Sequence, residues 1–252
     1  MKRLLFLAML LLLFSGCGGS GETWQRIERD GVLRVGLDPT YPPFEVDEGG
    51  GLRGLDVDLA EALAADLGLT VAYTYLGYDG LYDGLGTSQV DLLLSALVIQ
   101  PERTRDFSYS DPYFNAGQML LANDPTIQSL ADLDGRSVAV ELGSEGHVQA
   151  IEWSRRLTSL QIDQFNTPEE ALQAAEEGRS AAVLIDAISS GLYLLNHESA
   201  LSYRGEPIVN EPYALVVRAD DELLLEKLNE ALARLQASGE LDRIIRSHLI
   251  VP

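Results

Sequence analysis

The sequence predicts an α/β fold made of two lobes that pack across a cleft. Short runs rich in Val, Leu and Tyr alternate with stretches of helical periodicity, and this alternation is typical of βαβ units. It passes through two cycles, and no segment rich in Pro, Gly and Ser separates them. Two α/β units joined without a linker favour lobes in contact over independent domains.

The first cycle begins with a predicted strand over residues 32–37, followed by a helix over residues 56–68. The apolar side chains of this helix recur at the spacing of one helical face, and Gly68 is a stop signal. Residues 70–76 and 91–97 are rich in Val, Tyr and Leu, and we expect both to be strands.

The second cycle has predicted strands over residues 137–142, 160–165 and 181–185, with a helix that begins near Gly146. Its next helix starts at a strong signal. Thr167 is a typical N-cap residue, the following proline suits the first helical position, and a glutamate three residues after the threonine completes a capping box.

The rest of the chain returns to the same alternation. Residues 187–196 form a predicted helix, and residues 213–217 a strand. Two final helices are expected over residues 221–237 and 240–249. The pattern therefore remains α/β to its end.

The N-terminus predicts export. Lys2 and Arg3 precede an apolar run over residues 4–14, which is shorter than the roughly 20 residues of a membrane-spanning helix. A basic start, a short apolar run and small residues before a cleavage point are typical of a secretory signal peptide, here residues 1–16. We expect an extracytoplasmic protein.

Cys17 is the only cysteine of the 252 residues, so an intramolecular disulfide is excluded. The segment 14–17 resembles a bacterial lipobox, which implies that Cys17 carries a diacylglyceryl group and anchors the mature chain to a membrane. Phe14 departs from the leucine usual at its position, and the alternative is a free cysteine after an ordinary signal peptide. Residues 17–30 are the expected tether, and the protein a membrane-anchored lipoprotein of the periplasm or cell surface.

The charge excludes some partners. Loss of residues 1–16 removes Lys2 and Arg3 but no acid, so the net charge changes from −21 to −23. Such a balance opposes binding to nucleic acids and to anionic lipid surfaces. We expect contact with the membrane through the lipid anchor only.

Ligands of open parallel sheets bind beyond the carboxyl ends of strands, so the residues that follow the predicted strands carry the functional signal. Several ordered motifs occupy these places. They are Asp38 with Tyr41 and Pro43-Phe44-Glu45, Gly54-Leu55-Asp56-Val57-Asp58-Leu59, Val90-Asp91-Leu92, Pro101-Glu102-Arg103-Thr104-Arg105, Phe107-Ser108-Tyr109-Ser110-Asp111-Pro112-Tyr113, Asp132-Leu133-Asp134-Gly135 and Val183-Leu184-Ile185-Asp186.

Together these motifs closely resemble the polar amino-acid-binding proteins of ABC transporters, the bacterial extracellular solute-binding protein family 3, over nearly the whole mature chain. The resemblance implies a type II periplasmic-binding-protein fold in which two α/β lobes close over a ligand at hinge crossovers. The resemblance implies that residues 31–112 and 215–252 form lobe 1, residues 118–209 form lobe 2, and residues 113–117 and 210–214 are the hinges.

The resemblance also implies the main contacts with the ligand. Arg103 would form a bidentate ion pair with the α-carboxylate, for which a guanidinium has the right geometry; the alternative is a surface arginine. Asp186 would receive the α-ammonium, and its alternative role is the N-cap of the following helix. Tyr41 and Tyr78 would flank the ligand side chain. The alternative role of each tyrosine is to cover the hydrophobic core.

Four further positions are implied contacts. Ser144 and Glu145 lie at a helix start that should offer N–H groups to the carboxylate, although Glu145 is a departure from the family pattern and its side chain must point away. Val98 replaces a threonine of many relatives and retains only its backbone N–H as a donor. Ala96 offers its carbonyl to the ammonium group.

Asp38 and Glu141 would face the far end of the ligand. Two carboxylates and two aromatic faces suit a cation, because enclosing both acids around a neutral side chain would leave charge unpaired. We expect arginine, lysine or ornithine as the ligand, with glutamine or another polar amino acid as the alternative if Glu141 faces solvent. The expected partners are the membrane subunits of an ABC transporter, and the expected state is a monomer.

A different class of function is an enzyme, because the same fold hosts cyclohexadienyl and arogenate dehydratases. Glu141 would then be the proton donor. A third class, the receptor ectodomain, is disfavoured by the lack of a hydrophobic segment after the last helix. No cofactor or metal is expected, since the three histidines lack ligand spacing.

Overall fold

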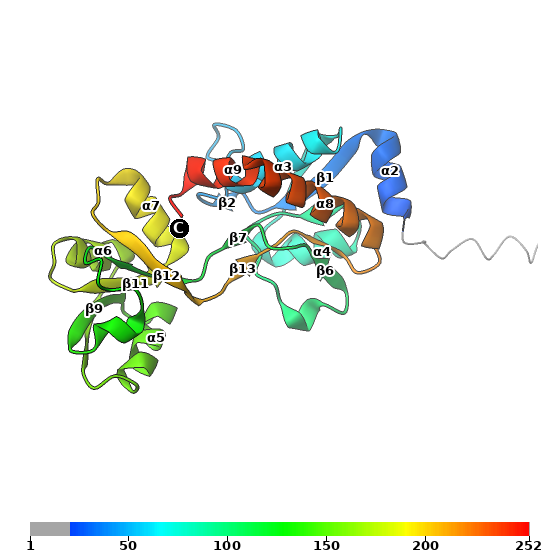
Figure 1. Cartoon of the computed structure of the whole chain (residues 1–252). Helices are drawn as coiled ribbons and strands as arrows, with labels where there is room; N and C mark the ends of the chain where they lie inside the picture. Colours follow the sequence, from blue (N-terminus) through cyan, green and yellow to red (C-terminus); the bar gives the residue numbers. More distant parts are fainter. Residues whose placement is uncertain (1–20, 252) are drawn as a thin grey trace, which may run out of the picture.

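The structure is a computed structural model that describes residues 21–251 (Figure 1). The predicted signal peptide and the predicted lipid attachment at Cys17 lie outside these residues. The described chain forms two five-stranded sheets, each flanked by helices, and the sheets lie at opposite ends of an elongated molecule. The predicted two-lobed α/β fold is confirmed.

Lobe 1 contains the sheet with strand order β4-β1-β5-β14-β6. Strands β4, β1 and β5 are parallel, and β14 is antiparallel to both of its neighbours. The strands are β1 (Val32–Leu37), β4 (Thr70–Tyr75), β5 (Leu92–Leu93), β6 (Phe107–Tyr109) and β14 (Val216–Arg218), and the small hairpin is β2 (Thr40–Tyr41) with β3 (Glu45–Val46). The helices are α2 (Glu22–Asp30), α3 (Leu55–Asp66), η1 (Tyr78–Gly80), α4 (Leu81–Gly86), η2 (Pro101–Arg103), α8 (Glu222–Ser238) and α9 (Glu240–His248).

Lobe 2 contains the sheet with strand order β10-β9-β11-β8-β12. Strands β10, β9 and β11 are parallel, whereas β8 and β12 run antiparallel to their neighbours. The strands are β8 (Gln118–Ala122), β9 (Arg136–Glu141), β10 (Leu160–Phe165), β11 (Ala182–Asp186) and β12 (Ser202–Val209). The helices are η3 (Leu130–Leu133), α5 (Glu145–Ser154), α6 (Pro168–Glu176) and α7 (Ala187–Asn196).

The chain passes between the two sheets through β7 (Phe114–Asn115) and β13 (Pro212–Tyr213), which pair with each other as antiparallel strands (Figure 1). The two crossovers approach closely. A Cβ atom at Gly117 would lie 1.8 Å from the carbonyl oxygen of Val209, so only glycine fits there. The C-terminal segment also reaches lobe 2, where the N–H of Ile250 donates to the carbonyl of Gly191 (3.2 Å).

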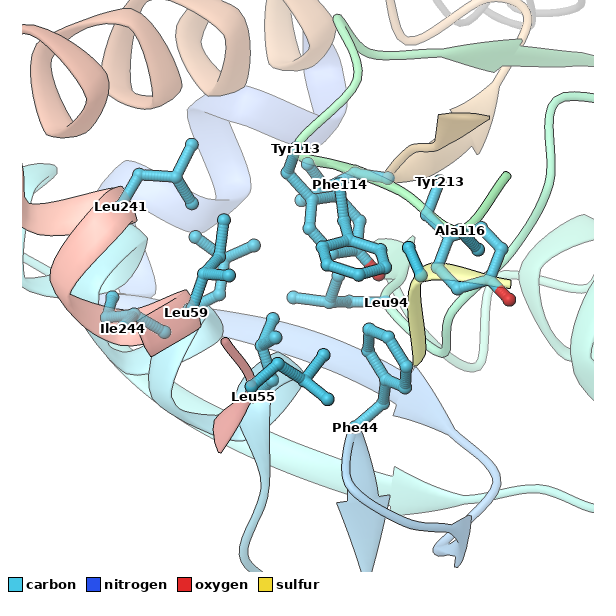
Figure 2. Packing of buried hydrophobic residues seen from close by; sticks show 14 of the residues in the cluster. Phe44, Leu55, Leu59, Leu94, Tyr113, Phe114, Ala116, Tyr213, Leu241 and Ile244 are labelled. Carbon is cyan, nitrogen blue, oxygen red and sulfur yellow. The ribbon is translucent and has the colours of Figure 1, made fainter. Parts of the chain in front are cut away.

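The core of lobe 1 extends to the crossovers (Figure 2). Phe44 follows the β2 strand and is fully buried. Its ring contacts Phe114 and Tyr213 edge to face, at centroid distances of 5.3 and 5.4 Å. One aromatic residue of lobe 1 therefore packs against both crossovers, and such pairs contribute beyond the area they bury.

Most predicted elements are confirmed to within two residues, among them β1, β4, β10 and α7, and so is the predicted start of α6. Two predicted strands are wrong in extent. The strand expected over residues 91–97 ends at Leu93, because the chain turns away through Ala96 in a left-handed conformation (φ 48°). The strand expected over residues 213–217 divides into β13 and β14.

The tether expected over residues 17–30 is corrected in its second half, because Glu22–Asp30 form helix α2. This helix packs on lobe 1 through buried Trp24 and Ile27. Arg26 forms an ion pair with the fully buried Asp91 (2.5 Å). The sequence analysis also missed β8 and β12. Within residues 21–251, helices that combine the length and apolarity needed to cross a bilayer are absent.

Candidate ligand-binding cleft

A pocket of about 410 Å³ opens on the face of lobe 1 that carries the predicted site residues. Five of those residues line it, and they come from the loop after β1, from β2, from η1 and from the loop after β5. The full lining is Asp38, Thr40, Tyr41, Glu45, Tyr78, Ser95, Ala96, Val98, Glu211 and Tyr213. The carboxyl ends of β1 and β5 thus meet at one edge of the sheet, as ligand sites in parallel sheets do.

Asp38 holds the pocket wall together. Its Oδ2 accepts from the backbone N–H of Tyr78 (2.9 Å), and its Oδ1 accepts from the hydroxyl of Thr40 (2.9 Å). The backbone N–H of Asp38 donates to the Ser95 hydroxyl (3.0 Å). These bonds join the three loops that surround the pocket, and they leave acceptor capacity on a carboxylate that has about four lone-pair sites.

Aromatic rings form the other walls. The rings of Tyr41 and Phe44 stack at 5.7 Å, while Tyr41 remains 44% exposed and Tyr78 remains 62% exposed. Tyr213 of the second crossover is buried beside the pocket. Burial, followed by the nearby Tyr41, Glu211 and Asp186, raises the pKa of its hydroxyl. The pocket therefore offers two exposed tyrosine faces, which are suited to apolar stems or to cations.

Glu211 is a pocket residue that the sequence analysis missed. It precedes β13 on the second crossover, its backbone N–H donates to Oδ1 of Asn115 (2.9 Å), and its carbonyl accepts from the N–H of Ala116 (3.0 Å). Its side chain is exposed at the pocket. The sequence did contain one signal for this residue, because Glu211 is an acid inside the predicted hinge at 210–214.

Arg103 does not line this pocket. It ends η2, and its guanidinium lies over the ring of Tyr82 with Cζ 4.1 Å from the centroid. Its Nε donates to Oε1 of Gln100 (2.5 Å). Burial raises the pKa of Tyr82, and the charge of Arg103 acts in the opposite direction. The arginine is thus exposed but held by stacking.

Three predicted residues of lobe 2 lie outside the lobe 1 pocket: Glu141 ends β9, and Ser144 and Glu145 are at the start of α5. Ser144 is the N-cap: its hydroxyl accepts from the N–H of His147 (3.1 Å) and donates to the carbonyl of Glu141 (2.8 Å). Glu145 lies along the helix, where its carboxylate accepts from Gln149 (2.8 Å). The Glu145 side chain therefore points along the helix toward Gln149 and away from the helix N-terminus.

Asp186 ends β11 and is the N-cap of α7, where its Oδ1 accepts from the N–H of Ser189 (2.7 Å). The alternative role predicted for Asp186, the N-cap of the following helix, is therefore present. The same carboxylate contributes to the raised pKa of Tyr213, so it lies within electrostatic reach of the crossover. The next N–H, of Ala187, donates to the carbonyl of Gly117 (3.0 Å), which joins α7 directly to the first crossover.

The predicted residues thus form two groups. Asp38, Tyr41, Tyr78, Ala96 and Val98 gather in one pocket, and the remaining predicted contacts lie outside it. Another cavity, of about 340 Å³, lies between α6 and α7 and contains none of the predicted residues. Among the described residues, no cluster of three or more His, Cys, Asp and Glu side chains has the arrangement of a metal site.

Comparison with known proteins agrees with this architecture. The family of bacterial extracellular solute-binding proteins, family 3, matches residues 33–250. The arginine-binding extracellular protein ArtP of Bacillus subtilis (strain 168) is 30% identical over 243 residues, which cover 96% of this chain and 94% of that protein.

Two solved structures are also similar. The ancestral cationic amino acid solute-binding protein AncCDT-1 is 32% identical, with a TM-score of 0.67 and coverage of 91% of this chain and 100% of the other. The L-cystine solute receptor of Neisseria gonorrhoeae, in its unliganded open conformation, is 27% identical, with a TM-score of 0.80 and coverage of 89% and 95%. The type II periplasmic-binding-protein fold is therefore confirmed.

Proposed function

Because the chain belongs to the bacterial extracellular solute-binding proteins of family 3, we propose that it binds a free amino acid and delivers it to the membrane subunits of an ABC transporter. The proposed ligand is cationic: arginine, lysine or ornithine. The observation that carries this choice is the pair of carboxylates, Asp38 and Glu211, in one pocket with exposed tyrosine faces.

The preference for a cation follows from the charge of the pocket. Asp38 and Glu211 are the two carboxylates that line it, and its lining contains no Lys or Arg. A neutral or acidic side chain would enclose these carboxylates without a counter-charge, which costs several kcal/mol when the site is desolvated (on the order of 3–5). Tyr41 and Tyr78 add a favourable contribution of roughly 1–2 kcal/mol to a desolvated cation.

The proposed binding mode uses both lobes. Arg103 receives the α-carboxylate, together with the start of α5, and Asp186 receives the α-ammonium. In the described arrangement the pocket is lined by lobe 1 and the second crossover, so engagement of Ser144 and Asp186 requires the lobes to approach. The hinges at 113–117 and 210–214 supply this motion, and the closed form is the one recognised by the transporter.

A thermal-shift panel of the proteinogenic amino acids and ornithine tests the ligand. We expect arginine, lysine or ornithine to raise the melting temperature, because a ligand that binds only the folded state stabilises it. Calorimetry then ranks the cations. Stabilisation by glutamine or by cystine, without stabilisation by the cations, would reverse the choice of ligand and leave amino-acid binding intact.

We propose binding rather than catalysis. Glu141, the acid that would donate a proton, does not line the pocket. The residues that do line it include no Lys or Arg that could bind a dicarboxylate substrate. Incubation with prephenate or arogenate should leave both substrates unchanged. Formation of phenylpyruvate or phenylalanine above the rate of a buffer control would establish an enzyme instead.

We also propose that Cys17 is lipidated and that the protein acts as a monomer, anchored to a membrane in the periplasm or at the cell surface. Metabolic labelling with a radioactive fatty acid should label the wild type but not Cys17→Ala, and the variant should leave the membrane fraction. Label that persists in the variant would exclude this anchor. Light scattering of the chain from residue 18 onward measures its mass in solution.

A further inference from the structure

Two acidic side chains behind the pocket are fully buried. Glu45 in β3 and Asp56 in the first turn of α3 are each 0% exposed. Their backbones are adjacent, since the N–H of Asp56 donates to the carbonyl of Phe44 (2.9 Å). Buried carboxyl groups are rare unless they are paired, so this arrangement needs a chemical reason.

Each carboxyl group has one oxygen bound to the loop that follows β5. The hydroxyl of Ser95 donates to Oε1 of Glu45 (2.6 Å), and the backbone N–H of Ala96 donates to Oδ2 of Asp56 (2.7 Å). Ser95 in turn accepts from the N–H of Asp38. Glu45 therefore holds Ser95, and Asp56 holds Ala96, whose backbone conformation an alanine rarely adopts.

The other oxygen of each acid is unaccounted for. Oε2 of Glu45, Oδ1 of Asp56 and the hydroxyl of Tyr113 are buried, and none has a hydrogen-bond partner among the groups of residues 21–251 that meets strict geometry. Two carboxylates side by side in a dry interior cannot both be ionised. One proton between the two free oxygens would satisfy both and leave a single negative charge.

The local electrostatics agree with one bound proton. Burial, and then the charge of Asp56, raises the pKa of Glu45 to about 10. Burial raises the pKa of Asp56 to about 6, against the opposing effect of the Ala96 N–H. The other titratable groups that face the pair are Asp38, Tyr113 and His248, the last of which bonds to Asp58 (2.8 Å).

We propose that Glu45 and Asp56 are positioning residues that share one proton and thereby fix Ser95 and Ala96 at the floor of the pocket. Glu45 is the protonated partner and donates to Asp56. Asp56 stays ionised and accepts from Ala96, from Glu45 and from the hydroxyl of Tyr113 at the first crossover. The charge that remains lies beneath Ala96, whose carbonyl would face a ligand ammonium; this last point rests on the proposed function.

The sign of the pH effect on folding is determined by the raised pKa of Glu45. A carboxyl group whose pKa is higher in the folded than in the unfolded state takes up a proton on folding. Its stabilising contribution is complete below the unfolded pKa of about 4.5 and is lost as the pH rises toward the folded value. Glu45→Gln removes this loss, because the amide keeps an acceptor for Ser95 and a donor for Asp56 without titrating.

The first experiment uses ligand-free protein from residue 18 onward, unfolded by urea at pH 6 to 9. We expect the ratio of the folding equilibrium constants, E45Q over wild type, to increase by at least tenfold as the pH rises from 6 to 9. One titrating proton limits this increase to about tenfold per pH unit. The control E28Q removes an exposed carboxylate of α2 and should parallel the wild type. Parallel profiles for E45Q and the wild type would overturn the proposal.

Carboxyl carbon NMR of the wild type gives the same answer without a variant. One glutamate resonance should remain protonated above pH 7, and E45Q should lack it if that variant folds. Titration of every glutamate below pH 6 would exclude the shared proton. Neither measurement requires a ligand, so both decide the proposal even if the proposed function fails.

The second experiment measures arginine affinity by calorimetry between pH 5 and 8. The affinity of the wild type for arginine should fall as the pH decreases through about 6, because protonation of Asp56 removes its negative charge and weakens the bond that it accepts from the Ala96 N–H. Asp56→Asn should bind more weakly at pH 7.5 and should lack this pH step. A pH step that persists in D56N would assign it to another group. Failure of the wild type to bind any amino acid would instead contradict the proposed function.

Discussion

The two lobes hold their candidate residues in different ways. Lobe 1 has a formed pocket whose loops are joined by Asp38 and by the buried acids behind it. In lobe 2, Ser144 and Asp186 are bonded as helix N-caps, and Glu145 is paired along its own helix. Lobe 1 is therefore organised before a ligand arrives.

The difference indicates a division of labour. A preorganised pocket lowers the cost of ordering side chains on binding, so lobe 1 and the second crossover can make the first contacts. In the proposed binding mode, the helix N-termini of lobe 2 would add donors and a favourable dipole when the lobes approach. The crossovers connect both steps, since Glu211 lines the pocket and Tyr213 packs on Phe44.

The strongest test of the organised pocket is Gly54→Ala. Gly54 has φ 138°, and a Cβ atom there would lie 2.1 Å from the carbonyl oxygen of Phe44. Backbone strain and overlap should lower the free energy of unfolding by about 2–5 kcal/mol in urea denaturation. Gly49→Ala is the matched control, because its φ of 82° is also positive but nothing lies within 4 Å; its cost should be about 1 kcal/mol. Equal costs would show that the contact with Phe44 is unimportant.

A comparable effect, on binding instead of stability, is expected for Arg103→Ala. Loss of the proposed ion pair between Arg103 and the ligand carboxylate should weaken binding by roughly 2–5 kcal/mol. Arg103→Lys should keep only part of the affinity, because an ammonium group lacks the planar, bidentate geometry of a guanidinium. Arg105→Ala changes an exposed arginine of the same turn and should bind as the wild type does. Calorimetry with unchanged affinity for R103A would remove Arg103 from the site.

Asp186 can be divided into its two roles. Asp186→Ala should lower the free energy of unfolding by about 1 kcal/mol, since α7 loses its N-cap. Asp186→Ser keeps a capping oxygen, so its stability should stay near that of the wild type while its affinity falls by at least tenfold, because the charge facing the ammonium is lost. If D186S binds as tightly as the wild type, the carboxylate is a cap alone.

The smallest effect is expected for Glu145→Gln. Its carboxylate is exposed and accepts from Gln149, so removal of its charge should change ligand affinity by less than about threefold. Calorimetry at two salt concentrations measures this. A large gain in affinity would show that Glu145 approaches the ligand carboxylate when the lobes close, and the contrast between the lobes would then need revision.

Local patterns predicted most of the fold. The helix start at Thr167 is confirmed by the bond from the N–H of Glu170 to its hydroxyl (3.2 Å), because caps depend on neighbours in sequence. Strand β8 was missed because it is buried on both faces and lacks the period of two. The short β5 was overestimated because nothing in its composition marks the left-handed turn at Ala96.

By itself the sequence determined the α/β class, most of the strands and helices, the family, and five residues of one pocket, since these depend on periodicity and on motifs read within short segments. Only the tertiary structure decided that Glu211 enters the pocket from the second crossover, that Glu45 and Asp56 are buried together, and that α2 packs on lobe 1. The physical reason is that burial and the pKa of a carboxyl group depend on groups far away in sequence, brought close only when the sheets and crossovers assemble.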